Sequence, residues 1–495
     1  MATHRKTRRV WILIVVVILA FLGWLVWYSL FRELPQKLAN DSIEEAFKYG
    51  SMGGENASGL PLRLWLALPK MFPEYLPAPG GYAGLGLALE PGHEVPVGFS
   101  RKVIGVERVA INCALCHTAM VRKAGEVVPR LYLGGPGHTV NIQGYIRFLT
   151  ACASDPRFTS GNVLKAIAAD YDMPWFERQL YRFVYVPFTR RALLKEKQDY
   201  AWTYSRPLWG RGRIDSMNPI KVIQLKHSVG DTIGNSDMMP IWNMRPRVKS
   251  KIAFHWTGIN TDYREVVRNS AMGDGTGRPY MAAALPALDR VEKWLLDLPP
   301  PKFESLFPVD RALAAAGEPI FRQQCADCHA FGGRQTGMPL LLDDGLWGAR
   351  QFPTARRPLY TDPHRVDQWS TEDARAKNAY TAGYPWAFTH FRAINAYVSV
   401  PLDAIWIRAP YLHNGSIPYL ADVLEVPEKR TKVFYQGYDV YDPVRMGFLA
   451  EGPEAAHWGT QLATAKPGNS NQGHLWGTDL APEQKRALLE FLKTL

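Results

Sequence analysis

The chemistry in this chain centres on two copies of the pattern Cys-x-x-Cys-His. They lie in "INCALCHTAM" and "FRQQCADCHA", with Cys113, Cys116 and His117 in the first and Cys325, Cys328 and His329 in the second. In this pattern two cysteine thioethers hold a porphyrin, and the adjacent histidine supplies an axial ligand to its iron. A zinc site would need further Cys or His ligands close by, and a thioredoxin-like pair needs no histidine after it. The spacing therefore predicts two covalently bound haem c groups, with iron held by His117 and His329.

The cysteine count agrees with haem attachment rather than with a disulfide framework. Four of the five cysteines belong to the two motifs, and Cys152 in "TACASD" is left without a close partner. We expect Cys152 to be a small buried apolar residue.

The N-terminus predicts a membrane anchor. Residues 10–30, "VWILIVVVILAFLGWLVWYSL", carry no charge and are long enough to cross a bilayer as a helix. A cleaved signal peptide would have a shorter apolar core, followed by small residues at the cleavage site. The basic stretch "MATHRKTRR" places the N-terminus in the cytoplasm. We therefore expect a cytoplasmic tail (1–9), a signal anchor (10–31) in a bacterial inner membrane, and haem domains in the periplasm.

The formal net charge is +12, but the basic residues outside the tail form no stripe and no nucleic-acid-binding motif. Nucleic acid is therefore not an expected partner. An anionic membrane face and an acidic redox partner protein suit this charge better.

About two hundred residues separate the motifs, so each haem is expected to have its own domain. An amphipathic helix over 288–298 ends at three prolines, and a second helix, capped by Asp310, leads into the second motif. Alternating strand patterns are rare. The sequence predicts a mainly α fold with two cytochrome c-like haem domains, long loops, little β structure and one N-terminal transmembrane helix. The expected divisions are a juxtamembrane segment (32–60), an N-terminal haem c domain (61–304) and a C-terminal haem c domain (305–495).

The ligand opposite each axial histidine decides the chemistry, because two protein ligands give a closed electron carrier and an open position admits a small molecule. Most of the remaining histidines are expected to be structural. His474 stands out because it precedes a helix whose apolar stripe, at 487–492, would pack as in haem c domains.

These motifs resemble the di-haem cytochrome c peroxidase superfamily, and within it the rubber oxygenase-like branch. The superfamily resemblance rests on both haem motifs, on "YVSVPLDAIWIRAPYLHNGSIPYLADVL" (397–424) and on the closing "GTDLAPEQKRALLEFLKTL". The branch resemblance rests on "PVGFSRK", "GRGRIDSMNP", "SDMMPIWNMR", "FHWTGIN" and "YDVYDPVRMGF", and the likeness covers most of the chain after Pro61.

The resemblance implies ligands for the second haem. Where the peroxidases carry a methionine ligand before the closing helix, this chain has His474. Ligation by His329 and His474 is therefore expected, and an imidazole in place of a thioether lowers the potential. Met446 is the competing ligand, although it lies in a different loop.

For the first haem, the resemblance implies surroundings rather than a ligand. Trp242 corresponds to an aromatic residue between the haems, where it would relay electrons or simply pack in the core. His255 and Trp256 would be walls of the distal pocket. His138 lies roughly where a histidine caps this haem in many peroxidases, but its neighbours do not match, so a structural role is expected. His413 is expected to order a turn beside the second haem.

The resemblance implies an oxidoreductase that uses a small-molecule oxidant, peroxide or dioxygen, at the haem on His117. Rubber cleavage is not expected, because an enzyme acting on an extracellular polymer would be released from the membrane. Two alternatives stay open: an electron carrier without substrate chemistry, and a haem subunit of a respiratory complex.

Overall fold

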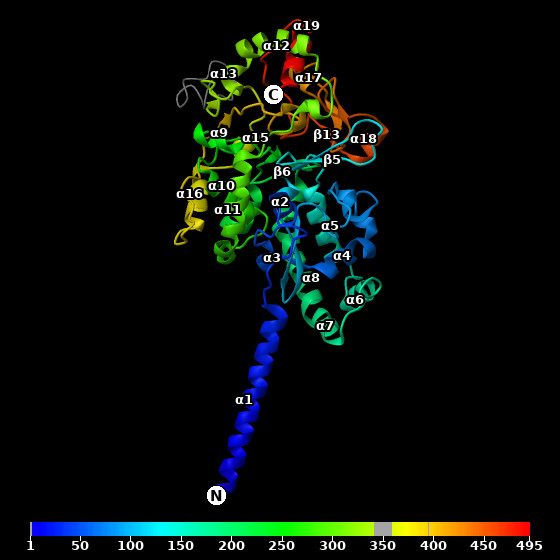
Figure 1. Ribbon diagram of the computed structural model, residues 1–495, viewed down its shortest axis with the longest axis vertical. Helices are drawn as coiled ribbons and strands as arrows, with labels where there is room; N and C mark the ends of the chain where they lie inside the picture. Colours follow the sequence, from blue (N-terminus) through cyan, green and yellow to red (C-terminus); the bar gives the residue numbers. More distant parts are fainter. Residues whose placement is uncertain (1, 341–358, 395) are drawn as a thin grey trace.

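The computed structural model describes residues 2–340, 359–394 and 396–495. It is 45% helical and 11% strand, so the mainly α prediction agrees with it. One long helix, α1 (Ala2–Leu30), projects from a body that contains the rest of the described chain (Figure 1).

Helix α1 is long and apolar enough to cross a membrane. Its segment Trp11–Leu30 has a mean hydropathy of 2.5 and is almost entirely exposed. The end of the helix is held against the body, because the Tyr185 hydroxyl donates to the Ser29 carbonyl and the Leu34 amide donates to the Val103 carbonyl at 3.1 Å. The predicted apolar helix is therefore present, while its orientation in a membrane stays a prediction.

The first haem motif follows a three-stranded antiparallel sheet with the order β1-β3-β2. Its strands are β1 (Leu60–Pro61), β2 (Phe99–Ile104) and β3 (Val106–Ile111). Gly105 turns β2 into β3 with a φ of +72°, and a Cβ there would lie 2.2 Å from the Ser29 carbonyl oxygen. The sheet therefore joins the end of α1 to the start of the first motif.

Helices surround this sheet and form the first hydrophobic core. They are α4 (Leu62–Met71), α5 (Ile142–Ser154), α8 (Val186–Asp199), α10 (Tyr263–Gly273) and α11 (Met281–Asp297). Cys152 is fully buried in α5, as expected for a small apolar residue. The predicted helix over 288–298 is the second half of α11, which starts earlier because the Ala-rich "MAAAL" strongly favours helix.

The second core is built on helices that flank the second motif. They are α12 (Arg311–Gln324), α13 (Ala326–His329) and α19 (Pro482–Leu492). The predicted cap is present, because the Asp310 carboxylate accepts from the Leu313 amide at 3.0 Å. Helices α12 and α19 cross at Gly317, where a Cβ would lie 2.0 Å from the Ala487 carbonyl oxygen.

The remaining elements are short. The other α-helices are α2 (Ile43–Tyr49), α3 (Gly54–Ala57), α6 (Ser160–Ala168), α7 (Trp175–Leu180), α9 (Met244–Lys249), α15 (His364–Asp367), α16 (Thr371–Tyr380), α17 (Leu420–Val423) and α18 (Gly452–Trp458). Antiparallel pairs join β4 (Thr118–Val121) to β5 (Arg130–Leu133), β6 (Arg213–Asp215) to β7 (Asn235–Asp237), β8 (Pro339–Leu340) to β9 (Tyr397–Val398), β10 (Val433–Gln436) to β13 (Thr460–Ala463), and β11 (Tyr441–Asp442) to β12 (Gly447–Phe448).

Each hydrophobic core contains segments from both halves of the chain. Ala119 and Val121 of β4 and the side chain of Trp242 pack in the second core, whereas α16 and Trp386 pack in the first. The predicted domain boundary between residues 304 and 305 stays a prediction, and this arrangement brings the surroundings of the two motifs together.

Candidate haem centres

The second motif forms a turn that faces a cavity. Cys325 follows α12, Cys328 lies in α13, and the His329 amide donates to the Cys325 carbonyl at 2.9 Å. The His329 Nδ1 donates to the Val400 carbonyl at 2.8 Å, which fixes the ring and leaves Nε2 for a metal. One turn thus presents both thiols and an oriented imidazole.

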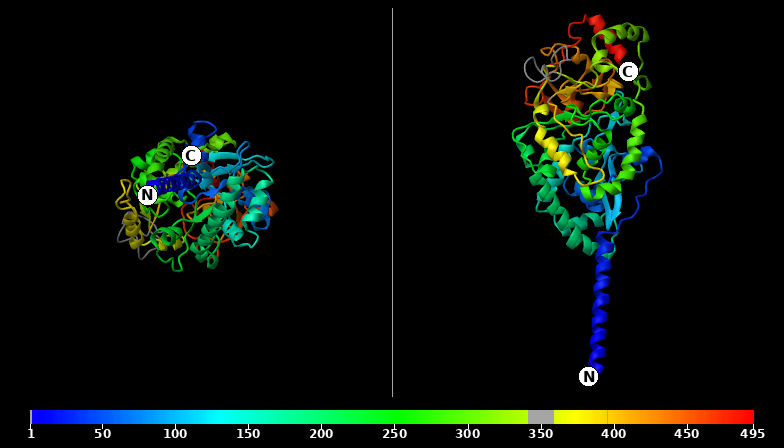
Figure 2. Two further views of the ribbon diagram at one scale, coloured as in Figure 1. Left: turned by 90° about the horizontal axis from the view of Figure 1, so that it is seen from below. Right: turned by 90° about the vertical axis from the view of Figure 1, so that its left-hand side faces the viewer.

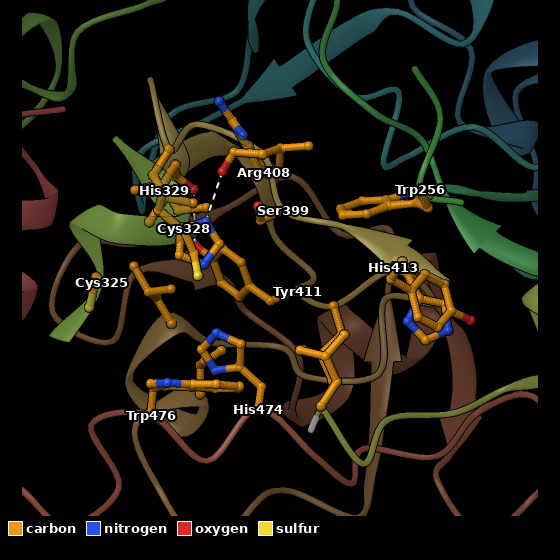
Figure 3. Close-up of a pocket in the computed structure, with 18 of the residues that line it drawn as sticks. Trp256, Cys325, Cys328, His329, Ser399, Arg408, Tyr411, His413, His474 and Trp476 are labelled. Carbon is orange, nitrogen blue, oxygen red and sulfur yellow. Dashed lines mark hydrogen bonds between the residues drawn. The ribbon is translucent and has the colours of Figure 1, made fainter. Parts of the chain in front are cut away.

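His474 lies opposite His329 across this cavity (Figure 3). The centroids of the two imidazole rings are 6.1 Å apart. A metal bonded to one nitrogen of each ring at about 2 Å would separate the centroids by roughly 6 Å. The two predicted ligands are therefore spaced for one iron between them.

The cavity has a volume of about 230 Å³ and is lined mainly by apolar side chains, among them Leu402, Leu424 and Leu488. Two arginines add positive charge to its wall. Arg247 and Arg408 share the Asp403 carboxylate at 2.5 and 2.6 Å, and the Nε of Arg408 is buried without a described partner. An apolar slot with thiols at one edge and guanidinium groups at another suits a porphyrin and its carboxylates.

A buried arginine holds the loop that carries His474. Arg430 donates to the carbonyls of Asn471 at 2.6 Å, Gly473 at 2.7 Å and His474 at 3.0 Å. The backbone of His474 has a φ of +51°, a conformation that costs an L residue about 1–2 kcal/mol. Sequence reasoning missed Arg430, since "PEKRTK" reads as an ordinary charged surface loop.

The surroundings keep the second-site imidazoles neutral. Burial, together with the nearby His329 and Arg430, lowers the pKa of His474 to about 3. Burial also lowers the pKa of His329. A neutral imidazole keeps the lone pair that metal binding requires.

The first motif is positioned by the end of β3 and by the hairpin β4–β5. The Asn112 side chain caps the turn by accepting from the Ala114 amide at 3.0 Å, and the His117 amide donates to the Cys113 carbonyl at 3.1 Å. The Gly134 amide donates to the His117 carbonyl at 2.8 Å. In both motifs, therefore, the amide of the histidine donates to the carbonyl of the first cysteine and closes the turn.

Unpartnered buried polar atoms gather around the first motif. The Nδ1 of His117, the Nε2 of His255 and the hydroxyl of Tyr263 have no hydrogen-bond partner among the described residues. Buried polar groups are normally paired, so these atoms indicate a bound group. Burial raises the pKa of the Cys113 thiol and lowers the pKa of His117 to about 4, and the Met239 backbone partly opposes the latter shift.

His255 and Trp256 serve different motifs. Burial, together with the nearby Arg365 and His117, lowers the pKa of His255 to about 3. Trp256 instead lines the second cavity, and its Nε1 donates to the Asp237 carbonyl at 3.0 Å. His255 thus lies near the first motif and Trp256 lines the second cavity, while the distal-pocket roles expected of both stay predictions.

Trp242 lies between the two motifs and is completely buried. A Cβ on Gly135 of the hairpin that follows the first motif would lie 3.1 Å from its ring. On the other side, the Arg408 guanidinium carbon, in the wall of the second cavity, is 6.0 Å from the ring centroid. A position between two haems and a role in electron transfer stay predictions.

Three further residues considered from the sequence have other surroundings. The His138 ring stacks on Phe448 at 3.6 Å, in the second half of the chain. His413 lines the second cavity and stacks on Tyr397 at 4.1 Å. Met446 is buried and lies outside the set of described residues that line this cavity.

Residues 396–435 match the RoxA-like, cytochrome c-like family. The matched segment runs from β9 to β10 and supplies much of the second cavity wall, including Arg408 and His413. It therefore supports a cytochrome c that carries haem c.

Two relatives come from Sinorhizobium fredii (strain NBRC 101917 / NGR234). The uncharacterized protein y4iJ is 41% identical over 109 residues, which are 20% of this chain and 18% of the relative. The uncharacterized protein y4iM is 32% identical over 176 residues, 32% of this chain and 38% of the relative. The matched part is less than two fifths of either relative.

The described residues also bear on the zinc alternative. In ranges 2–340, 359–394 and 396–495, no three His, Cys, Asp or Glu side chains gather as a bare metal ion would require. The Cys and His of each motif thus lack the extra ligands that a tetrahedral zinc site needs.

Proposed function

We propose that this chain is a membrane-anchored periplasmic cytochrome with two covalently bound haem c groups and an oxidoreductase activity. The observation that carries the proposal is the 6.1 Å separation of the His329 and His474 rings above the Cys325–Cys328 turn. Haem c, when bound, would supply an iron that changes between Fe(III) and Fe(II).

In this proposal the second centre transfers electrons only. His329 and His474 would both hold the haem iron, which would then serve electron transfer and not substrate binding. Hydrogen bonds from Arg430 to the His474 loop would keep the distal imidazole in place through the redox change. The paired Arg408 and Asp403 would hold a haem carboxylate without leaving an isolated buried charge.

The first centre would carry out the reaction. His117 would hold its iron, and the unpartnered Nε2 of His255 would accept a proton from peroxide or return one to oxygen as it is reduced. Trp242, between the hairpin β4–β5 and Arg408, would relay electrons from the second centre. A redox partner protein would supply or accept them.

The proximity of His255 to His117 also favours a second candidate, a cytochrome without substrate chemistry. If the His255 Nε2 binds the first iron permanently, both centres are closed. The chain would then be an electron carrier or the haem subunit of a respiratory complex.

Cyanide binding distinguishes the two candidates. For the oxidoreductase, we expect one haem that ignores cyanide and one that binds it. His255→Ala should then slow cyanide binding about 100-fold, because the base that accepts the proton of HCN is lost.

For the electron carrier, the wild-type protein should show two low-spin haems that ignore cyanide, and His255→Ala should create a high-spin haem that binds it. Stopped-flow spectroscopy and EPR of the oxidised holoprotein measure both effects. His138→Ala is the matched control, since that ring stacks on Phe448. A high-spin signal in the control would instead make His138 the ligand.

A further inference from the structure

Three large aromatic side chains are exposed on consecutive helical segments of the first half. Trp175 lies in α7, Phe183 in the π-helical turn η4 (Tyr181–Tyr185) and Phe188 in α8, with 74%, 68% and 65% of their surfaces exposed. Single exposed apolar residues are common, but three large aromatics on one helical stretch mark an interaction surface.

The same stretch is basic. Residues 174–199 contain six Lys or Arg and three Asp or Glu. Glu177 is already paired with Arg63 at 2.9 Å. Arg178, Arg182 and Arg191 make no ion pair with any described residue. Exposed aromatics interspersed with free guanidinium groups are typical of helices that lie at the surface of an anionic bilayer.

The position of this stretch supplies the reason for its composition. Both ribbon views place α7 and the adjoining end of α8 at the end of the body from which α1 projects (Figures 1 and 2). The contact is direct, because the Tyr185 hydroxyl of η4 donates to the Ser29 carbonyl in the last turn of α1. A bilayer crossed by Trp11–Leu30 would therefore have its surface beside α7 and η4.

We propose that the face formed by Trp175, Phe183, Phe188 and the neighbouring arginines docks on the anionic phospholipid surface of the membrane that α1 crosses. The aromatic rings would lie at headgroup depth, and the guanidinium groups would pair with lipid phosphates. This inference rests on the anchor in the proposed function. Its consequence is that the body has one orientation on the membrane, held by a second contact besides α1.

Photo-crosslinking tests the proposal in the full-length holoprotein, reconstituted in vesicles of phosphatidylcholine with phosphatidylglycerol. The substitution Phe183→p-benzoylphenylalanine puts a photoreactive ring at the face with little change of shape. Val444, 77% exposed in the turn between β11 and β12, provides the matched negative position, and Phe21 in α1 the positive one.

We expect lipid adducts at positions 21 and 183 and at least tenfold fewer at 444. Lipid adducts at position 21, together with no more adducts at position 183 than at position 444, would overturn the docking proposal but would leave the membrane anchor supported. No adducts at 21 overturn the anchor itself and the inference that rests on it. Crosslinks from 183 to protein instead of lipid make the face a protein interface and also overturn the proposal.

The charge contribution has its own measurement. Replacing Arg178, Arg182 and Arg191 by Gln should reduce the adducts at position 183 at least fivefold in vesicles that contain phosphatidylglycerol, since each basic residue near an anionic surface strengthens the binding. Adducts at 21 should not change. An undiminished yield at 183 would contradict phosphate pairing.

Discussion

At the scale of residues, His474, which faces His329, and His255, which lies near His117, share an unusual backbone. His255 has a φ of +64° and His474 a φ of +51°, in the left-handed region that glycine favours. Such conformations cost about 1–3 kcal/mol and persist where surrounding contacts enforce them, commonly at functional sites. Arg430 provides these contacts for His474, and the bridge between Phe254 and Asn260 closes the turn that carries His255.

Replacing His474 by Met tests the second ligand pair. A thioether stabilises Fe(II) relative to an imidazole, so the potential of one haem should rise by on the order of 100 mV while the other stays unchanged. A spectroscopic redox titration measures both. Met446→Leu is the control and should change neither haem, whereas a His474→Met protein with two unaltered potentials would remove His474 from the ligand set.

Arg430→Met tests positioning through the loop. The variant leaves the carbonyls of Gly473 and His474 without their buried donor, so the imidazole should detach in part of the population. EPR of the oxidised protein should then show a high-spin fraction from the second haem. Arg445→Gln, at a partly exposed arginine that bonds Glu451, should leave the spectrum low-spin. A fully low-spin Arg430→Met protein would mean that the loop holds without the arginine.

At the scale of elements, the crossing of α12 and α19 supports the second motif. Gly317→Ala places a methyl group where the Ala487 carbonyl oxygen would be 2.0 Å away, and Phe491 also lies close. The helices must separate, which should cost about 1–3 kcal/mol of unfolding free energy. Denaturant unfolding measures the loss. Ala316→Ser, on the exposed side of α12, should cost less than about 0.5 kcal/mol, and an equally stable Gly317→Ala protein would contradict the close packing.

Helix α16 contains a buried lysine, Lys377, that makes the stability of the first core depend on pH. Burial lowers the pKa of Lys377 to about 7, and its Nζ donates to Gln224. The unfolded chain binds this proton up to its ordinary pKa near 10.5 and the folded chain only below about 7, so the lysine destabilises the fold increasingly as the pH falls through that window.

Lys377→Met should therefore stabilise the protein most near pH 7, and this gain should shrink by about 1.4 kcal/mol per pH unit between pH 8 and 10. Denaturant unfolding at several pH values checks the slope, with Lys302→Met, at an exposed lysine, as the control for lost charge. A gain that does not vary with pH would show that Lys377 is charged in the fold.

Local signals predicted part of the architecture. The Asp310 cap, the end of α11 before three prolines, the closing helix α19 and both haem-motif turns follow from short-range sequence rules. Short-range rules do not predict that the neighbouring residues His255 and Trp256 serve different motifs. Trp256 is held by the Asp237 carbonyl and His255 lies near His117, and both partners are distant in the sequence. The packing of α16 on the first core also depends on contacts between residues distant in the sequence, and so do the hydrogen bonds from Arg430 to the His474 loop.

At the scale of the whole molecule, the second motif and helix α1 lie at opposite ends. Helices α12, α13 and α19 are at the end of the body away from α1 (Figure 1). A protein that exchanges electrons with the second centre would therefore approach from the side that faces away from the membrane. The first motif lies nearer α1, because β3 leads into it and the β2–β3 turn packs on Ser29.

The number of covalently bound haems decides the central proposal most directly. Intact-mass spectrometry of the protein, produced in cells that mature c-type cytochromes, should give the polypeptide plus two haems. Changing Cys113 and Cys116 together to Ser should remove one haem, and changing Cys325 and Cys328 should remove the other. A wild-type mass with one haem or none, or two haems still attached after either double substitution, would contradict a di-haem cytochrome.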